Sequence, residues 1–167
     1  MSSPEFIQYP SAKIILRLPQ DNKILLLART IAGETALEPA GGKVEVNFEK
    51  RSSESFEECI IREVREELKI ETKVTHYIGS YYFFWSSKNN VCSNCVLFLG
   101  DIIAGTVNSV QQEECGQLSL AWATIEQLKQ KKIPIRAYHV GLEELLVKAA
   151  YILEAQFKSE CKTSSAS

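Results

Sequence analysis

The sequence predicts a single α/β domain. Three observations support this fold class: an amphipathic helix at residues 54–70, short apolar runs rich in β-branched residues on both sides of it, and a second amphipathic helix near the C-terminus. The chain has 167 residues, of which 45% are hydrophobic, and this suits one domain with a substantial core. We expect the domain at residues 11–158, after an N-terminal segment, 1–10, and before a disordered polar tail, 159–167.

The charge balance excludes some classes of function. A net charge of -2 and a pI near 5.8 give no general basic field, so non-specific nucleic-acid binding and a membrane-surface role are not expected. The first ten residues lack the basic start and apolar run of a signal peptide, and no later apolar stretch is long enough to span a bilayer. We therefore expect a soluble cytoplasmic protein.

The cysteines predict no disulfide framework. Five cysteines are an odd number and are scattered through a chain without secretory features. Cys92 and Cys95 have zinc-like spacing, but no second pair follows, and Cys95 alternates in phase with Leu97 and Leu99. We expect them to be buried or edge thiols without a metal.

The strands are expected in hairpin-like order. Apolar runs at 12–18 and 23–28, separated by turn-forming residues, predict a strand pair, and 30–38 is expected to be an irregular crossing segment. A long strand at 73–86, with a bulge at Gly79, should pair with a strand at 91–103. Shorter strands are expected at 106–110 and 118–123, around an acidic loop.

The helix at 54–70 carries the chemistry. Glu63, Glu66 and Glu67 form an acidic stripe that lies against the apolar stripe of the same helix. Two carboxylates about 6 Å apart repel by roughly 2 to 3 kcal/mol at an effective dielectric near 20, so such a cluster favours a bound cation. Hard oxygen ligands without His or Cys favour Mg²⁺ or Mn²⁺. The alternative is a solvated acidic face, partly neutralised by Arg62 and Arg65.

A glycine pair precedes this helix. Gly41 and Gly42 permit close backbone approaches, so this loop could bring main-chain carbonyls and the ammonium group of Lys43 to a ligand at the acidic face. The alternative is an ordinary loop. Ser52 and Ser53 are candidates for the N-cap of the helix.

These residues resemble the Nudix box, G-x5-E-x7-R-E-U-x-E-E-x-G-U, where U is apolar. From Glu54 onward the spacing matches, through the run Arg62-Glu-Val-Arg-Glu-Glu67. Two positions depart from the pattern. Eleven residues separate Gly42 from Glu54 where the family has five, and Lys69 stands where the family has its second glycine.

The resemblance implies the Nudix fold, a mixed β-sheet sandwiched between α-helices. It implies metal-dependent hydrolysis of a nucleoside diphosphate linked to another moiety, with release of a nucleoside monophosphate. An ADP-ribose-like or ADP-sugar-like compound is our first expectation, and a nucleoside triphosphate the second. By motif position, the metal ligands would be Glu63, Glu66, Glu67 and a carbonyl at Gly41 or Gly42.

The resemblance assigns the remaining roles as follows. Arg62 would orient a carboxylate, and Lys43 could lie against a phosphate. The general base would be Glu66 or a loop acid, Glu113 or Glu114, and the alternative for these loop acids is plain solvation. A non-catalytic nucleotide-binding module on the same fold is the alternative function, and an unrelated α/β domain is a third.

Aromatic residues fill the long strand after the helix. Tyr81, Phe83 and Trp85 alternate with Tyr82 and Phe84, so that aromatics point to both faces. One set is expected in the core. The other, Tyr82 and Phe84, could bind substrate by stacking or form a homodimer interface, and simple packing is the alternative.

The C-terminal third is predicted to be mainly helical. Thr124 is expected to cap a short helix, and a core-facing amphipathic helix is expected at about 137–157.

Overall fold

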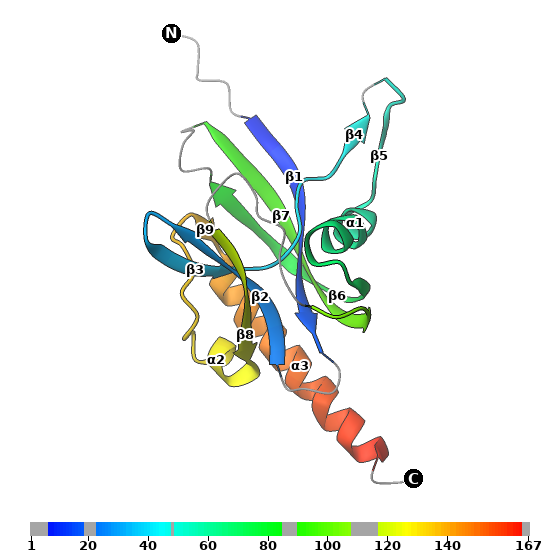
Figure 1. Ribbon diagram of the computed structural model, residues 1–167, viewed down its shortest axis with the longest axis vertical. Helices are drawn as coiled ribbons and strands as arrows, with labels where there is room; N and C mark the ends of the chain where they lie inside the picture. The colour runs from blue at the N-terminus through cyan, green and yellow to red at the C-terminus, as the bar shows by residue number, and fades with distance from the viewer. Residues whose placement is uncertain (1–6, 19–22, 48, 85–89, 108–116, 165–167) are drawn as a thin grey trace.

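The computed structural model describes residues 7–18, 23–47, 49–84, 90–107 and 117–164, with side chains as far as 160. Its strands and helices follow in the order β1 (Ile7–Arg17), β2 (Lys23–Ile31), β3 (Glu34–Glu38), β4 (Val46–Asn47), β5 (Ser52–Ser53), α1 (Phe56–Leu68), β6 (Glu71–Phe84), β7 (Val91–Ala104), β8 (Gln117–Thr124), α2 (Ile125–Lys129), β9 (His139–Val140) and α3 (Leu142–Ser164). Figure 1 shows this arrangement, with α3 extending beyond the sheet toward the C-terminus.

The central sheet is mixed. Its strand order is β3-β2-β1-β7-β6-β9, and β8 pairs with the other edge of β2. The strands β1 and β7 run parallel from the pair Ile7 and Val91 to the pair Arg17 and Asp101, while the other pairings are antiparallel. The sequence and structure agree on the α/β class and on a mixed sheet with flanking helices.

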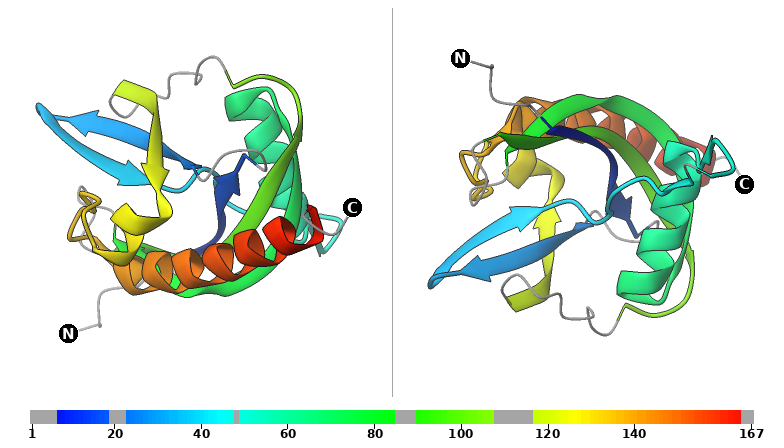
Figure 2. Two further views of the ribbon diagram at one scale, coloured as in Figure 1. Left: turned by 90° about the horizontal axis from the view of Figure 1, so that it is seen from below. Right: turned by 90° about the horizontal axis from the view of Figure 1, so that it is seen from above.

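The two long helices cover opposite faces of the β1-β7-β6 layer, as both views in Figure 2 show. One core cluster joins α3 to β1, β6 and β7 through Ile15, Ile78 and Leu97, which are fully buried. The other joins α1 to β1 through Ile60, Val64 and Ile14. Because successive residues of β1 point to opposite faces, its unbroken apolar run supplies both cores.

The strand β1 changes partner along its length, and this positions the glycine loop. Its last residues pair with β2, with Leu16 opposite Leu25. Its earlier part instead pairs with residues 40–44: Ala12 N donates to the Gly42 carbonyl at 2.9 Å, and Ile14 N donates to the Ala40 carbonyl at 2.9 Å. Backbone hydrogen bonds therefore hold the glycine loop beside β1, in the way that they would hold a neighbouring strand.

Several boundaries differ from the sequence-based expectations. The segment expected to be irregular at 30–38 contains β3, which pairs with β2, and residues 46–53 contain the short hairpin β4-β5. The predicted bulge at Gly79 is confirmed by a register shift between Tyr77 and Gly79. The predicted strand at 106–110 lies largely outside the described residues.

The last helix also differs from the prediction. It begins at Leu142 and continues to Ser164, so residues 159–164 of the expected tail are helical. Within this extension, Glu160 binds the buried Arg17 of β1 at 3.0 Å. The two residues are far apart in sequence, so local sequence patterns do not predict the contact. No helix among the described residues is long and apolar enough to cross a membrane.

Candidate active site

The helix α1 is fixed at both ends by its own residues. Its N-cap is Ser55, and neither Ser52 nor Ser53 caps it, because these residues form β5. The Ser55 hydroxyl accepts from Glu58 N at 3.1 Å, and the Glu58 carboxylate accepts from Ser55 N at 2.7 Å, which makes a complete capping box. At the other end Lys69 adopts the left-handed conformation, with φ 57°. Lys69 therefore ends the helix as the family glycine would.

The glycine loop packs directly against the acidic stripe of α1. A Cβ atom at Gly42 would lie 2.2 Å from Glu63 Oε1, and Gly41, with φ +114°, could not hold a Cβ because the Ala12 carbonyl oxygen would be 2.3 Å away. Gly41 N donates to Glu67 Oε2 at 3.3 Å. Both glycines are thus required for the loop to reach Glu63 and Glu67.

Arg62 is the centre of an ion-pair network beside this loop. Its guanidinium binds Glu54 at 2.7 Å, Glu63 at 2.9 Å and Glu66 at 3.2 Å, and it donates to the Lys43 carbonyl at 3.2 Å. Hydrogen bonds to Glu54 and Glu63 raise the pKa of Arg62, while partial burial opposes them. Arg62 therefore neutralises the stripe and links the helix to the loop.

The three predicted ligand carboxylates differ in exposure. The side chain of Glu63 is 17% exposed and Glu67 is buried, but the side chain of Glu66 is 60% exposed. Among the described residues, no three His, Cys, Asp or Glu side chains are grouped closely enough to hold a metal ion. The ion pairs of Arg62 with Glu63 and Glu66 account for the separation of the carboxylates.

The chemistry of the donors nevertheless fits Mg²⁺ or Mn²⁺. Glu63 and Glu67 lie against the glycine loop, and the Gly41 carbonyl already accepts a cationic donor, the ammonium group of Lys13. All these donors are hard oxygens. Glu113 and Glu114, the alternative general bases, lie outside the described residues.

A thiol also ties α1 to the loop. Cys59 Sγ donates to the Lys43 carbonyl at 3.4 Å and lies 3.7 Å from the Gly42 carbonyl. Burial, together with the nearby Glu54 carboxylate, raises the pKa of Cys59 to about 12. The protonated thiol is therefore a donor that holds the loop, not a reactive nucleophile.

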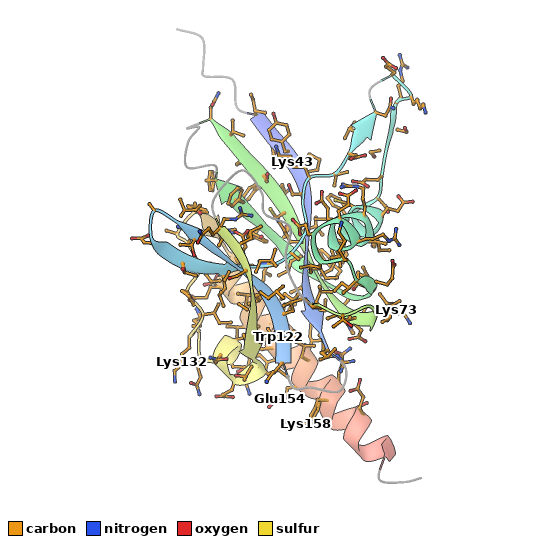
Figure 3. All side chains as sticks on the ribbon, viewed as in Figure 1. Lys43, Lys73, Trp122, Lys132, Glu154 and Lys158 are labelled. Carbon is orange, nitrogen blue, oxygen red and sulfur yellow. The ribbon has the colours of Figure 1, made fainter. Side chains whose placement is uncertain are left out.

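The two lysines at the loop lie in different surroundings. Lys43 pairs with Ser11 at the edge of β1, and its Nζ lies 4.6 Å from the centroid of the Tyr9 ring. Figure 3 shows Lys43 beside the N-terminal half of β1. Lys13, which the sequence analysis did not identify, is half-buried and reaches Gly41 from the middle of β1.

A buried polar cluster continues from Lys13. Its centre is Glu38, at the end of β3, which binds Arg29 at 2.7 Å and lies 3.7 Å from His139 Nε2. Burial alone would raise the pKa of Glu38, but the contact with His139 and the charges of Lys13 and Arg29 lower it to about 2. Glu38 is therefore ionised at neutral pH.

Three buried polar atoms near Glu38 have no hydrogen-bond partner within the described part of the chain: the Tyr81 hydroxyl, Arg136 Nε and His139 Nδ1. Burial raises the pKa of Tyr81 well above its usual value, and the Cys95 thiol beside it adds to this effect. Because an unpaired buried polar group costs about 1 to 3 kcal/mol, such a concentration suggests a site completed by a ligand or by water.

The structure places Tyr82 and Phe84 away from this cluster. Tyr81 and Phe83 pack around His139, with ring centroids 5.9 and 4.8 Å from the imidazole. Tyr82 and Phe84 alternate with them and so point to the other face of β6, where they are 47% and 42% exposed. The role of Tyr82 and Phe84 in substrate binding stays a prediction.

The sequence held only weak signals for the residues that were missed. Lys13 is a lone cation inside an apolar strand, and Glu38 directly precedes the Pro-Ala-Gly-Gly segment. Both positions are signals of a polar site, because charged residues are rarely buried unless they are paired. His139 carried no such signal, since its approach to Glu38 depends on β9 joining the sheet. Cys92 and Cys95 are buried free thiols, as predicted.

Comparison with known proteins addresses the family. The family model described as NUDIX domain matches residues 8–142. No curated protein sequence matches significantly. Among solved structures, the MutT protein from Methanosarcina mazei Go1 is similar with a TM-score of 0.62 and 20% identity, over 93% of this chain and 99% of that one.

Two further solved structures have the same fold. A NUDIX hydrolase from Nitrosomonas europaea has a TM-score of 0.59 and 20% identity, over 86% of this chain and 88% of the other. An ADP-ribose pyrophosphatase from Streptococcus suis has a TM-score of 0.55 and 17% identity, over 89% and 91%. These matches confirm the predicted fold. The chain therefore belongs to the NUDIX family.

Proposed function

We propose that this protein hydrolyses a nucleoside diphosphate linked to another moiety, in a reaction that depends on Mg²⁺ or Mn²⁺ and releases a nucleoside monophosphate. The observation that carries this proposal is the packing of Glu63 and Glu67 against Gly41 and Gly42. ADP-ribose-like compounds are the first candidate substrates and nucleoside triphosphates the second. The similar structures include both a MutT protein and an ADP-ribose pyrophosphatase, so they do not distinguish between these two substrate classes.

The residues that would hold the ion are Glu63, Glu67, the Gly41 carbonyl and Glu66. A bound divalent ion would neutralise adjacent phosphates and lower the pKa of a water molecule. Glu66 is the most exposed of the three carboxylates, so it is the one best placed to change partner and accept a proton from the attacking water. Glu113 and Glu114 remain alternative bases.

The chain's own cations would orient the substrate. Lys43, which follows the glycine pair, would contact a phosphate, and Arg62 holds Glu63. We propose that the nucleoside or the second moiety contacts the buried polar cluster, where the Tyr81 hydroxyl and His139 Nδ1 have no hydrogen-bond partner among the described residues. Water attacks one phosphorus, the anhydride P–O bond breaks, the base takes the water proton, and the leaving phosphate departs.

The test is a substrate panel. Purified protein with Mg²⁺ should release a nucleoside monophosphate from at least one of ADP-ribose, an ADP-sugar, a dinucleotide and a nucleoside triphosphate. Glu67→Gln should abolish this turnover while the protein stays folded. Glu57→Gln, at an exposed position of the same helix, should retain it.

Two outcomes would count against the proposal. Unchanged turnover in Glu67→Gln would remove the assigned mechanism. Tight nucleotide binding without turnover of any panel member would favour the non-catalytic module.

A cytoplasmic location and a homodimer formed through the exposed face of Tyr82 and Phe84 are further proposals. Size-exclusion chromatography with light scattering tests the homodimer.

A further inference from the structure

Lys13 already places a positive charge on a proposed metal ligand. Its ammonium group donates to the Gly41 carbonyl, while the amide of Gly41 donates to Glu67. The lysine and a divalent ion would thus compete for one oxygen. Because two cations cannot share this oxygen without strong repulsion, Lys13 must leave if the carbonyl is to serve as a ligand.

Lys13 can leave without exposing an unpaired buried charge. Its other charged neighbour is Glu38, whose pKa it helps to lower. Glu38 keeps Arg29 at 2.7 Å and His139 at 3.7 Å when Lys13 moves. Lys13 is itself half-buried, so its ammonium group is not enclosed by the core. Its position is consistent with a movable side chain rather than a fixed internal ion pair.

The site needs a cation for the substrate. Arg62 is engaged by Glu54, Glu63 and Glu66, and the proposed contact of Lys43 supplies a single positive charge. A diphosphate brings several negative charges next to the acidic stripe. An ammonium group released from Gly41 would be beside the bound phosphates at that moment.

We propose that Lys13 is a phosphate-binding residue that occupies the Gly41 carbonyl in the empty enzyme and turns to the substrate's diphosphate when a divalent ion takes the carbonyl. This inference rests on the proposed function and adds a residue to it. It couples the two binding events, since the ion that displaces Lys13 also makes its charge available to the phosphates.

The test measures two affinities that should change in opposite directions. Lys13→Met removes the ammonium group. Mn²⁺ binding without nucleotide, followed by the electron paramagnetic resonance signal of free Mn²⁺, should become about threefold to tenfold tighter because the competing cation is gone. Binding of methylenediphosphonate, which has two phosphorus groups and no base, should become about tenfold weaker at saturating Mn²⁺.

Two variants serve as controls. Lys148→Met removes a lysine that caps another backbone carbonyl, that of Ile78, and should change neither affinity. Lys13→Gln keeps an N–H donor for Gly41 but no charge, so it should weaken diphosphonate binding even if Lys13→Met folds poorly. Thermal unfolding of each variant checks the fold.

The results separate this inference from the proposed function. If Lys13 only supports the loop, Lys13→Met should weaken both affinities, and this would overturn the inference. Equal values in Lys13→Met and Lys148→Met would also overturn it, with the hydrolase proposal intact. A wild-type protein that binds no Mn²⁺ would instead contradict the proposed function itself.

Discussion

Two arginines of this protein each bind several carboxylates, but they connect different parts of the chain. Arg17 joins three elements: it binds Asp101 of β7 at 2.8 Å and Glu160 of α3 at 3.0 Å from its place on β1. Arg62 binds Glu54 and Glu63, which are close to it in sequence. The Arg17 side chain is 10% exposed and that of Arg62 is 24% exposed.

The difference shows how one chemical group can serve stability or function. The Arg17 cluster fixes the far end of α3 to the sheet. The Arg62 cluster uses the same charge pairing to hold carboxylates at the edge of the glycine loop, where a metal ion could take them over. Disrupting the first should mainly lower stability, and disrupting the second should mainly lower activity.

The largest expected effect is on stability. Arg17→Met should lower the free energy of unfolding by about 2 to 3 kcal/mol, because it leaves Asp101 partly buried without its partner. Urea denaturation measures this change. The exposed pair of Arg65 and Glu71 provides a control, since Arg65→Met should cost less than about 1 kcal/mol. Equal losses of unfolding free energy in Arg17→Met and Arg65→Met would contradict the structural role assigned to Arg17.

The converse variant tests the active-site side of the comparison. If Arg62 orients the proposed metal ligands, Arg62→Met should lower kcat/KM by about 10-fold to 100-fold. Its effect on unfolding should be smaller than that of Arg17→Met. Steady-state kinetics on the substrate found in the panel measures the first change. Normal activity with a large loss of stability would reverse the roles assigned to the two arginines.

A third carboxylate cluster should dominate the response to acid. The folded-state pKa of Glu38, about 2, lies below the ordinary value of 4.5. Its contribution to stability is therefore complete above pH 4.5 and is lost as the pH falls toward 2. In Glu38→Gln, the free energy of unfolding should therefore fall by about 2 to 3 kcal/mol less on acidification than in the wild type.

Denaturation at several pH values between 2 and 6 measures the effect of Glu38→Gln. The exposed Glu34 lies on the same strand, so Glu34→Gln controls for the removal of one carboxylate. If the free energy of unfolding falls equally in the wild type and in Glu38→Gln over this range, the buried cluster is not the cause of the loss of stability in acid.

The smallest expected effect concerns the end of α1. Lys69, with φ 57°, takes the place of the second glycine of the Nudix box. Lys69→Gly should stabilise the protein by up to about 1 kcal/mol, because glycine adopts this conformation without strain. Thermal unfolding measures this gain, and activity should stay the same. A destabilised variant would show that the lysine side chain supports the cap.

Local patterns in the sequence predicted most of the fold. The apolar periodicity of α1 and the alternating runs of β6 and β7 depend on neighbouring residues, so they can be read from a single chain. The expected N-cap, Ser52 or Ser53, was wrong: Ser55 caps the helix and forms a capping box with Glu58. The helical end of α3 depends on Arg17, which lies 143 residues away from Glu160.

The candidate site divides in the same way. Glu63, Glu67 and the glycine pair belong to the region that resembles the Nudix box, and the resemblance implied their proximity. Lys13, Glu38 and His139 come together only when β1, β3 and β9 assemble. The aromatic strand has the expected alternation: Tyr81 and Phe83 lie beside His139, whereas Tyr82 and Phe84 are on the exposed face, and their role in substrate binding stays a prediction. Periodicity defines two faces and cannot say which one meets a ligand.

The most direct test of the central claim is a Mn²⁺ titration of the wild-type protein and of the double variant Glu63→Gln, Glu67→Gln. If these two side chains hold the catalytic ion against the glycine loop, the wild type should bind Mn²⁺ and the double variant should bind it at least about tenfold more weakly with its fold intact. Equal Mn²⁺ affinity in the two proteins would contradict the account.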